Sequence, residues 1–358
     1  MFKPNQGHGP SQELVTGATG LVGMERLVFR LERGWPTVAL YREGSDLARV
    51  EGVLRERLRS GFDVAWGALQ WRKADLSDVL SLEEAMEGCV RVFHAAGRVS
   101  FQTGDEGALK AVNAVGTANV VNAALATGVR RLFHISSVSA LGRSAKDPDT
   151  GLSLPVVETA DWADGAGATP YGVSKHAAEM EVWRGVAEGL EAVVVNPTVI
   201  LGDARYGESS GMVYRRASQG RRHYPVGGGG FVGVADLMEV CAALDAAIES
   251  GQQGILGERF IVSAEEVRHR DVMVWVANEF GVAGPTRPLK GWMLSLAWRS
   301  AAFWSWLTRT APMLTRDLAF NTQVSHRYDT SKLLGVLPGF EFTPIRDVIR
   351  QCMAKGKG

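Results

Sequence analysis

The chain has 358 residues, and 46% of them are apolar, which is enough for one large domain or two unequal ones. Its 39 lysines and arginines balance its 39 acidic residues, so the charge gives no indication of a nucleic-acid-binding or anionic membrane surface. The three cysteines lie far apart without CxxC or Cys/His spacing, which predicts free thiols, no metal site and a reducing, cytoplasmic location. Residues 1–12 are polar and rich in Pro and Gly, so we expect a flexible tail and no signal peptide. No unbroken apolar run reaches the roughly 18 residues that a membrane span requires.

Three glycines with the spacing GxxGxxG follow the first apolar run. Gly17, Gly20 and Gly23 come after a predicted strand at 12–16 and before a predicted helix at 24–33. This order is typical of a dinucleotide-binding turn, in which the first glycine permits the tight turn, the second lets the backbone approach the pyrophosphate, and the third lets the helix pack closely on the strand. The amide groups at the start of the helix would then face the di-anion.

The second predicted strand, at 36–41, is followed by Arg42 and Glu43. An acidic residue at this strand end suits the ribose 2′-OH of NAD(H), whereas an arginine suits the 2′-phosphate of NADP(H). Arg42 therefore favours NADP(H). Glu43 keeps NAD(H) open, because its carboxylate could point toward the ribose instead.

A second group of polar residues lies in the middle of the chain. Ser137 follows a predicted strand at 131–136, and the carboxyl ends of parallel strands are where such sheets bind their ligands. Tyr171 and Lys175 are four residues apart in a predicted helix, so they share one face. A tyrosine has an ordinary pKa of about 10, and a nearby ammonium is expected to lower it toward the working range. The three residues together predict proton transfer to or from an alcohol oxygen.

Predicted strands and helices alternate along most of the chain. This pattern predicts an α/β fold with a doubly wound parallel sheet of the Rossmann type. Gly227 to Gly230 is interpreted as a flexible loop, because no strand, turn and helix surround it. Further strands are expected at 90–95, 191–196 and 257–263, and further helices at 79–87, 107–127 and 171–188.

The order of these motifs resembles that of the extended short-chain dehydrogenases/reductases, and within them the dihydroflavonol 4-reductase-like and NAD-dependent epimerase-like group. The resemblance runs from about Leu14 to about Ile349. The matching segments are TGATGLVG at 16–23, Asp75-Leu76, FHAAG at 93–97, VNAVGTAN at 112–119 and NPTVILG at 196–202.

The resemblance implies a role for each matching position. It implies that Ser137, Tyr171 and Lys175 are catalytic, with Asn113 in support. It also implies a dinucleotide-binding Rossmann domain at 13–200, with a returning strand near 257–263, and a mainly substrate-binding lobe at 201–350. The residues that it implies for cofactor binding are Gly17, Thr19, Gly20, Leu21, Val22, Gly23, Arg42, Asp75, Leu76, Ala95, Ala96, Gly97, Tyr171, Lys175, Pro197 and Thr198.

We therefore expect an NADP(H)-dependent oxidoreductase that reduces a carbonyl group, or oxidises the alcohol, of a bulky apolar small molecule. One alternative is an NAD-dependent nucleotide-sugar epimerase or dehydratase with the same triad. A second alternative is a non-catalytic NAD(P)-binding regulator.

Two further expectations concern apolar surfaces. The segment at 291–309 carries four tryptophans, which predict a wall or lid of the substrate pocket, while a dimer surface or a membrane interface stay open. The predicted helices at 107–127 and 171–188 carry more apolar surface than one sheet face needs, so we expect them to pair in a homodimer.

Overall fold

The computed structural model describes residues 11–102, 104–142, 144, 153–160, 162, 168–203, 211, 214–215, 217–308 and 323–355. Of residues 297 and 301–308 it describes the backbone only. Most of the expected N-terminal tail, residues 1–10, lies outside these ranges.

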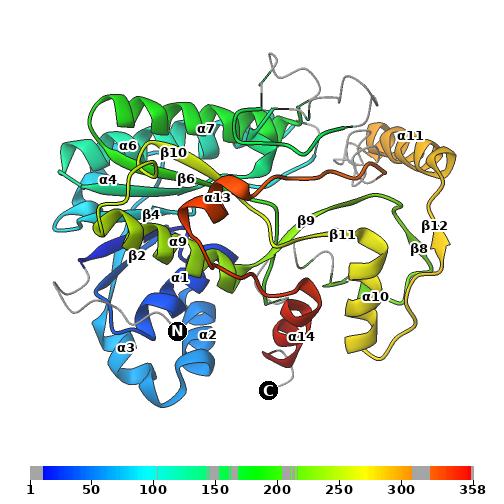
Figure 1. The fold of residues 1–358 in the computed structure, drawn as a ribbon, viewed down its shortest axis with the longest axis horizontal. Coiled ribbons are helices and arrows are strands. Elements are labelled where there is room, and N and C mark those ends of the chain that lie inside the picture. The colour runs from blue at the N-terminus through cyan, green and yellow to red at the C-terminus, as the bar shows by residue number, and fades with distance from the viewer. Residues whose placement is uncertain are drawn as a thin grey trace.

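A seven-stranded parallel sheet forms the centre of the larger part of the molecule (Figure 1). The strand order is β10-β6-β5-β4-β1-β2-β3, and every neighbouring pair is parallel. This order confirms the predicted doubly wound Rossmann fold, because the chain moves from β1 to one edge and then returns to build the other. The strands are β1 (Glu13–Thr16), β2 (Thr37–Tyr41), β3 (Leu69–Lys73), β4 (Arg91–His94), β5 (Arg131–Ile135), β6 (Glu191–Pro197) and β10 (Glu258–Val262).

Helices cover both faces of this sheet (Figure 1). Successive strand residues point to opposite faces, so Leu14 belongs to one hydrophobic core and Val15 to the other. Both cores are closed by the apolar sides of the helices packed on them. The face to which Leu14 points carries α4 (Val79–Met86), α6 (Gly116–Ala126) and α7 (Pro170–Ala187). The face to which Val15 points carries α1 (Leu21–Leu31), α2 (Leu47–Leu58), α3 (Phe62–Ala68) and α9 (Val234–Glu249).

A smaller lobe is built mainly from the C-terminal part of the chain, on the right of Figure 1. Its two small sheets have the strand orders β11-β9-β7 and β12-β8. The strands are β7 (Val199–Leu201), β8 (His223–Tyr224), β9 (Gly228–Gly233), β11 (Glu265–Arg268) and β12 (Arg287–Pro288). The helices of this region are α10 (His269–Glu279), α11 (Gly291–Thr308) and α14 (Ile345–Lys355), whereas α13 (Ser331–Val336) packs against β10 and the core of the central sheet.

The prediction of a flexible loop at Gly227 to Gly230 was wrong. Gly228 begins β9, which pairs with β7 on one side and with β11 on the other. A Cβ atom on Gly228 would lie 2.9 Å from the carbonyl oxygen of Val267, and one on Gly230 would collide with Thr198. The glycines therefore serve close packing between neighbouring segments, and not flexibility.

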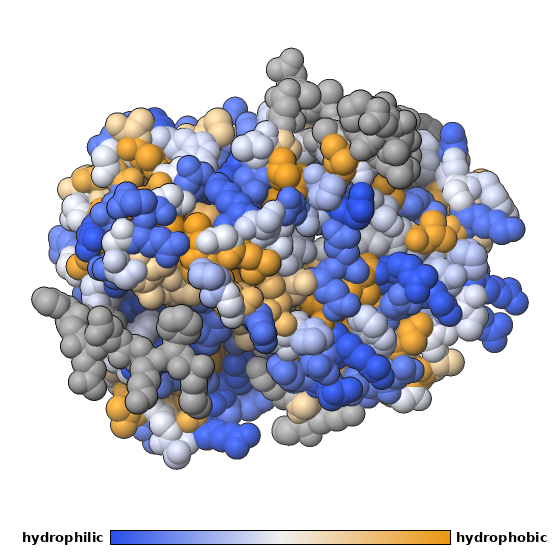
Figure 2. Space-filling view, in the orientation of Figure 1, coloured by the Kyte–Doolittle hydropathy of each residue, from blue (hydrophilic) through white to orange (hydrophobic). Residues whose placement is uncertain are grey.

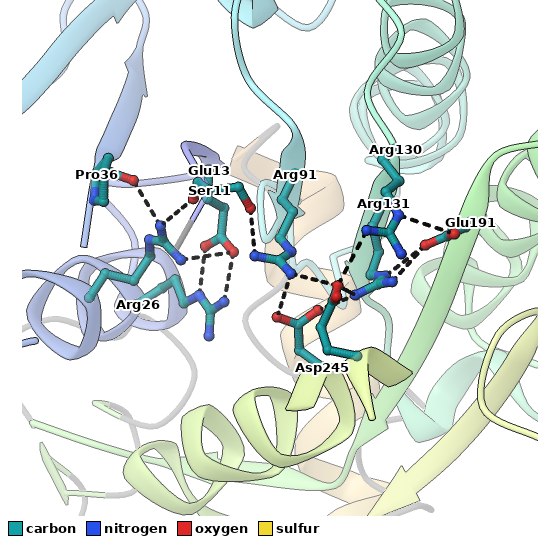
Figure 3. A network of polar contacts seen from close by, with 11 residues as sticks. Ser11, Glu13, Arg26, Pro36, Arg91, Arg130, Arg131, Glu191 and Asp245 are labelled. Carbon is teal, nitrogen blue, oxygen red and sulfur yellow. Dashed lines mark hydrogen bonds and ion pairs between the residues drawn. The ribbon is translucent and has the colours of Figure 1, made fainter. Parts of the chain in front are cut away.

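A network of ion pairs lies at the amino edge of the central sheet (Figure 3). Arg26 makes two hydrogen bonds of 2.7 Å each to the buried carboxylate of Glu13, at the start of β1. Arg131, at the start of β5, contacts Asp245 at 2.6 Å and Glu191 at 2.7 Å. Burial alone would raise the pKa of Glu13, but the surrounding arginines outweigh it and lower the pKa.

Hydrophilic and hydrophobic residues are interspersed over the face seen in Figure 2. Among the residues that the structure describes, no helix is both long and apolar enough to cross a bilayer.

Candidate active site

The glycine-rich turn connects β1 to α1 and has the geometry that a dinucleotide requires. Gly17 has a φ of +66°, and a Cβ atom there would lie 2.7 Å from the backbone of Ala96. A Cβ atom on Gly23 would collide with the carbonyl group of Gly17, so the third glycine allows the helix to pack on the turn. Gly20 is the exposed N-cap residue of α1, whose first turn contains no acidic residue. The amide groups at this helix start therefore fit a pyrophosphate.

The other residues of the turn contact two distant segments. Leu21 approaches Gly202 so closely that a Cβ atom on that glycine would collide with it, while Val22 packs against the hydrophobic core. The carbonyl oxygen of Thr19 accepts a hydrogen bond of 2.6 Å from the guanidinium group of Arg49 in α2. Sequence reasoning missed Arg49, because no local motif links it to the turn.

Charged side chains surround the ends of β2 and β3. Arg42 is exposed directly after β2, and its charge contributes to the lowered pKa of Asp75, after the hydrogen bonds from Ser77. The carboxylate of Glu43 is 3.0 Å from the ammonium group of Lys73. Glu43 is thus paired with a neighbouring cation, and Arg42 is available to solvent or to a ligand.

The segment after β3 contacts α6, and the segment after β4 contacts the glycine-rich turn. Leu76 accepts a hydrogen bond of 2.7 Å from Asn119 through its carbonyl oxygen. Residues 95–97 follow β4 directly, and the backbone of Ala96 lies against Gly17, as noted above. Asn119, in the matching segment at 112–119, therefore holds the backbone of Leu76 in place after β3.

Asn113 lies in a π-helical turn, Lys110–Val115 (η2), which links α5 (Glu106–Leu109) to α6. Single π turns are common at functional sites. The buried Asn113 amide accepts a hydrogen bond of 2.8 Å from the Arg98 backbone and donates to the Arg98 carbonyl and to Ser174, each at 2.9 Å. Its side chain joins the loop after β4 to α7.

Ser137 and Tyr171 lie beside each other at the carboxyl end of β5, and Ser137 acts to lower the pKa of the tyrosine. The hydroxyl of Thr169 caps α7 by accepting from the amide of Gly172, and Tyr171 follows in the first turn. A Cβ atom on Gly172 would lie 2.5 Å from the carbonyl oxygen of Ser139. The missing side chain at this position lets α7 approach the short helix after β5 (η3, Val138–Ala140) closely enough for the two hydroxyl groups to meet.

The protonation of Tyr171 differs from the expectation. Burial raises the pKa of Tyr171 to about 12, and the neighbouring hydroxyl group of Ser137 offsets this rise only in part. Lys175 is not the group that lowers it, because its Nζ donates a hydrogen bond of 2.8 Å to the carbonyl oxygen of Ile135. Burial lowers the pKa of Lys175 itself to about 8, against the opposing charge of Glu179. At neutral pH the pair thus consists of a protonated phenol and a mostly charged ammonium.

The two serines of the Ser136-Ser137 pair point to different partners. Ser136 is buried and donates a hydrogen bond to the carboxylate of Glu179. Asn196 donates to the same carboxylate at 2.6 Å and to the carbonyl oxygen of Ser137 at 3.0 Å. Sequence reasoning missed Glu179, although it stands four residues after Lys175 on the same helical face.

The end of β6 borders the site on the side of β10. Pro197 and Thr198 are buried there, and the amide of Thr198 donates a hydrogen bond of 3.0 Å to the carbonyl oxygen of Val262. On the opposite side, the ring of Phe101 meets the ring of Tyr171 edge to face, with their centroids 5.9 Å apart. Phe101 is 39% exposed and was also missed from the sequence.

Two buried histidines lie beneath the site. His94 is hydrogen-bonded to Thr16 at 2.7 Å and to Thr117 at 3.0 Å, whereas neither ring nitrogen of His134 has a partner among the described residues. Their ring centroids are 5.1 Å apart. Burial, together with the charge of Lys175, lowers the pKa of His94 to about 3 and that of His134 well below its ordinary value.

The tryptophan-rich segment forms α11, beside β12 in the small lobe (Figure 1). Trp292 is 66% exposed, and the guanidinium group of Arg299 lies 4.8 Å from the ring of Trp298. The side chains of Trp304 and Trp306 lie outside the described residues, so the predicted pocket wall stays a prediction.

The comparisons with known proteins agree with this geometry. A family model described as the NAD dependent epimerase/dehydratase family matches residues 13–262. The chain belongs to this family. It is an extended short-chain dehydrogenase/reductase of the dihydroflavonol 4-reductase-like group, and thus an NAD(P)-dependent oxidoreductase that acts on carbonyl or alcohol groups.

Three relatives illustrate the range of the family. Sterol demethylase protein B of Methylococcus capsulatus is 32% identical over 286 residues, which cover 78% of this chain and 79% of that protein. A putative dihydroflavonol 4-reductase of Synechocystis is 26% identical over 89% of this chain and 87% of its own length. The crystal structure of gox2253 superposes with a TM-score of 0.75 and 28% identity, covering 97% of this chain and 98% of that one.

Proposed function

We propose that this family member is an NADP(H)-dependent reductase that converts a carbonyl group of a bulky apolar small molecule to the alcohol, with Ser137, Tyr171 and Lys175 as its catalytic residues. The observation that carries the proposal is the position of Ser137 beside Tyr171 at the carboxyl edge of the sheet, where the serine hydroxyl acts to lower the pKa of the tyrosine. At that edge the glycine-rich turn and the ring of Phe101 also lie. The domain boundaries belong to the proposal: residues 13–200 hold the dinucleotide and residues 201–350 mainly the substrate.

The roles of the residues follow from their protonation states. When bound, a nicotinamide dinucleotide supplies hydride to the carbonyl carbon or accepts it from the alcohol carbon. Tyr171 carries its proton at neutral pH and donates it to the substrate oxygen as negative charge develops there. Ser137 donates a hydrogen bond to the same oxygen, and the ammonium group of Lys175 would hold the ribose of the nicotinamide.

The surroundings of Arg42 support NADP(H) over NAD(H). Glu43, the residue that could have pointed to a ribose hydroxyl, is paired with Lys73. Arg49 places its guanidinium group against the turn, and Arg42 is exposed directly after β2, so a 2′-phosphate bound there would accept charge-assisted hydrogen bonds from them.

The apolar surface next to Tyr171 supports an apolar substrate. Phe101 is 39% exposed and Val99 is 44% exposed, both in the loop after β4. A partly exposed aromatic ring in contact with the proposed proton donor offers stacking area to a flat or bulky carbonyl compound. The names of the sterol demethylase protein and the dihydroflavonol reductase point to substrates of that size and polarity.

A competition assay tests the proposal. Purified protein would be screened for NADPH oxidation with steroid, flavonoid and aromatic ketones and aldehydes, with nucleotide diphosphate sugars as competitors. We expect turnover of at least one apolar carbonyl compound and no inhibition by the sugars. Tight inhibition by a nucleotide diphosphate sugar with retained NAD would establish the epimerase instead, and cofactor binding without any turnover would establish a regulator.

We also propose a cytoplasmic homodimer formed by the outer faces of η2, α6 and α7. Val115, Val173 and Met180 are between 43% and 48% exposed on these helices. Exposed apolar side chains on two neighbouring helices suit a two-fold contact of four helices. Light scattering at micromolar concentration would give twice 38.6 kDa for the dimer, whereas a mass of 38.6 kDa would refute it.

A further inference from the structure

One face of α7 carries Tyr171, Lys175 and Glu179 at intervals of four residues. The side chains become more buried along this row: Tyr171 is half-buried, Lys175 is 4% exposed and Glu179 is fully buried. Burying a carboxylate is costly unless other groups compensate its charge and donate hydrogen bonds to its oxygens. The surroundings of Glu179 therefore indicate what keeps it in this position.

Three residues from three neighbouring strand segments contact the Glu179 carboxylate. Ser136, directly after β5, and Asn196 of β6 both donate hydrogen bonds to Oε1. Arg259 of β10 donates to Oε2 at 3.1 Å. These partners are 43, 17 and 80 residues away in the sequence. One carboxylate thus connects α7 to the strands on this side of the site.

Lys175 stands one helical turn before Glu179 on α7, and its Nζ donates a hydrogen bond to the carbonyl oxygen of Ile135 in β5. The titratable groups that act on it are Glu179 of α7, His94 of β4 and His134 of β5, and Arg259 of β10 acts from behind Glu179. Both histidines are held neutral by burial, so Glu179 is the group that favours the charged form of Lys175. Arg259 opposes it, because it partly neutralises the same carboxylate.

We propose that Glu179 is a positioning residue of this site, which fixes α7, and with it Lys175 one turn away, against the ends of β5 and β6 and against β10, while Arg259 partly neutralises the negative charge that Glu179 places near the Lys175 ammonium. The proposal rests on the proposed carbonyl reduction. It predicts that neutralising Glu179 and neutralising Arg259 have opposite effects on the protonation of Lys175.

The pH dependence of turnover tests this prediction. In the wild-type enzyme, reduction should decline as pH rises through about 8, where Lys175 loses its proton. In Glu179→Gln the alkaline limb of kcat/KM should move down by about one pH unit, and in Arg259→Gln it should move up. Glu181→Gln is the matched control, because it makes the same change on α7 at a residue that pairs outward with Arg184. A limb that stays in place in Glu179→Gln, or that moves in the same direction in both variants, would overturn the proposal.

A second measurement does not depend on turnover. Urea unfolding of Glu179→Gln, Lys175→Met and the double variant forms a double-mutant cycle, and we expect the double variant to lose less stability than the two single losses combined. Additive losses would contradict the proposal. If the wild-type protein reduces no carbonyl compound, the proposed function fails while the cycle still reports on Glu179 and Lys175. Arg259→Gln leaves the carboxylate in place, so it remains informative if Glu179→Gln does not fold.

Discussion

At the scale of single residues, Tyr171 is the group whose chemistry depends most on its surroundings. A phenol with a pKa of about 12 holds its proton at neutral pH, so it is a donor and not a base under these conditions. Carbonyl reduction consumes a proton, so the protonated form of Tyr171 that is present near neutrality is the form that the proposed reduction requires.

Tyr171→Phe keeps the ring and its contact with Phe101 but removes the proton. We expect kcat for carbonyl reduction to fall at least about a hundredfold while NADPH binding is retained, because general acid catalysis contributes about that much. Steady-state kinetics and a fluorescence titration of NADPH measure the two effects. Tyr224→Phe in β8 is the control and should leave kcat unchanged. Near-normal activity of Tyr171→Phe would exclude the proposed mechanism.

Arg42→Ala should weaken NADPH far more than NADH, by roughly 1–3 kcal/mol of lost charge-assisted hydrogen bonding. Glu43→Gln should change neither affinity much, since Glu43 faces Lys73 and is 89% exposed. The dissociation constants of NADPH and NADH for both variants test whether Arg42 recognises the 2′-phosphate. If Arg42→Ala weakens both cofactors equally, or Glu43→Gln weakens NADH selectively, Arg42 does not recognise the 2′-phosphate.

Sequence reasoning located the residues that stand in short local patterns. The glycines of the turn and the pair of Tyr171 and Lys175 were visible because their spacing alone implies a turn or a shared helical face. The partners of Glu179 and the raised pKa of Tyr171 were not visible. Both depend on burial and on contacts between segments that only the folded chain brings together.

At the scale of secondary-structure elements, the close approach of α7 to η3 places Tyr171 beside Ser137. Gly172 permits this approach, since any side chain would meet the backbone of Ser139. The helix start is fixed at the same place by the Thr169 cap and by Pro170 in the first turn.

Gly172→Ala should separate Tyr171 from Ser137 and lower kcat at least about tenfold, because small displacements of a reacting group are costly in rate. The fold should persist, as judged by circular dichroism. Gly52→Ala is the matched control: it is a helical glycine with nothing within 4 Å of the added carbon, so it should raise stability by about 0.5–1 kcal/mol and leave kcat unchanged. An unchanged kcat in Gly172→Ala would show that the close approach has no role in catalysis.

Elements were predictable where hydrophobic periodicity dominates. The strands of the sheet centre were predicted because they are mostly apolar and buried. No strand was predicted at β3, because this edge strand has the sequence LQWRK and only one buried residue. β9 was mistaken for a loop, since its glycines reflect the neighbours that pack against it and not a local turn. Whether such a glycine-rich segment forms a strand or a loop depends on the elements that pack against it.

At the scale of the whole molecule, stability should depend on pH through the buried histidines. A histidine whose pKa is lowered on folding binds its proton more readily when unfolded, so its contribution is lost as pH falls below the unfolded value of about 6.5. For His94 the loss continues down to about pH 3. Each such histidine contributes a slope of up to about 1.4 kcal/mol per pH unit.

We therefore expect the free energy of unfolding to decrease steadily from pH 6.5 to pH 4.5, before the carboxylates contribute. His134→Leu should make this decrease shallower, whatever its effect at pH 7, because it removes a titrating ring that has no described partner. Urea unfolding at several pH values measures the slope, with the exposed His223→Gln as the control. An equal slope in wild type and His134→Leu would contradict the assigned role of burial.

The network of ion pairs in Figure 3 ties the starts of β1, β4, β5 and β6 together at the edge opposite the proposed site. The ion-pair network and the proposed active site therefore lie at opposite ends of the same strands. We therefore expect that exchanging the loop after β4 with that of a relative changes the accepted carbonyl compound, while the anchored base of the scaffold stays intact.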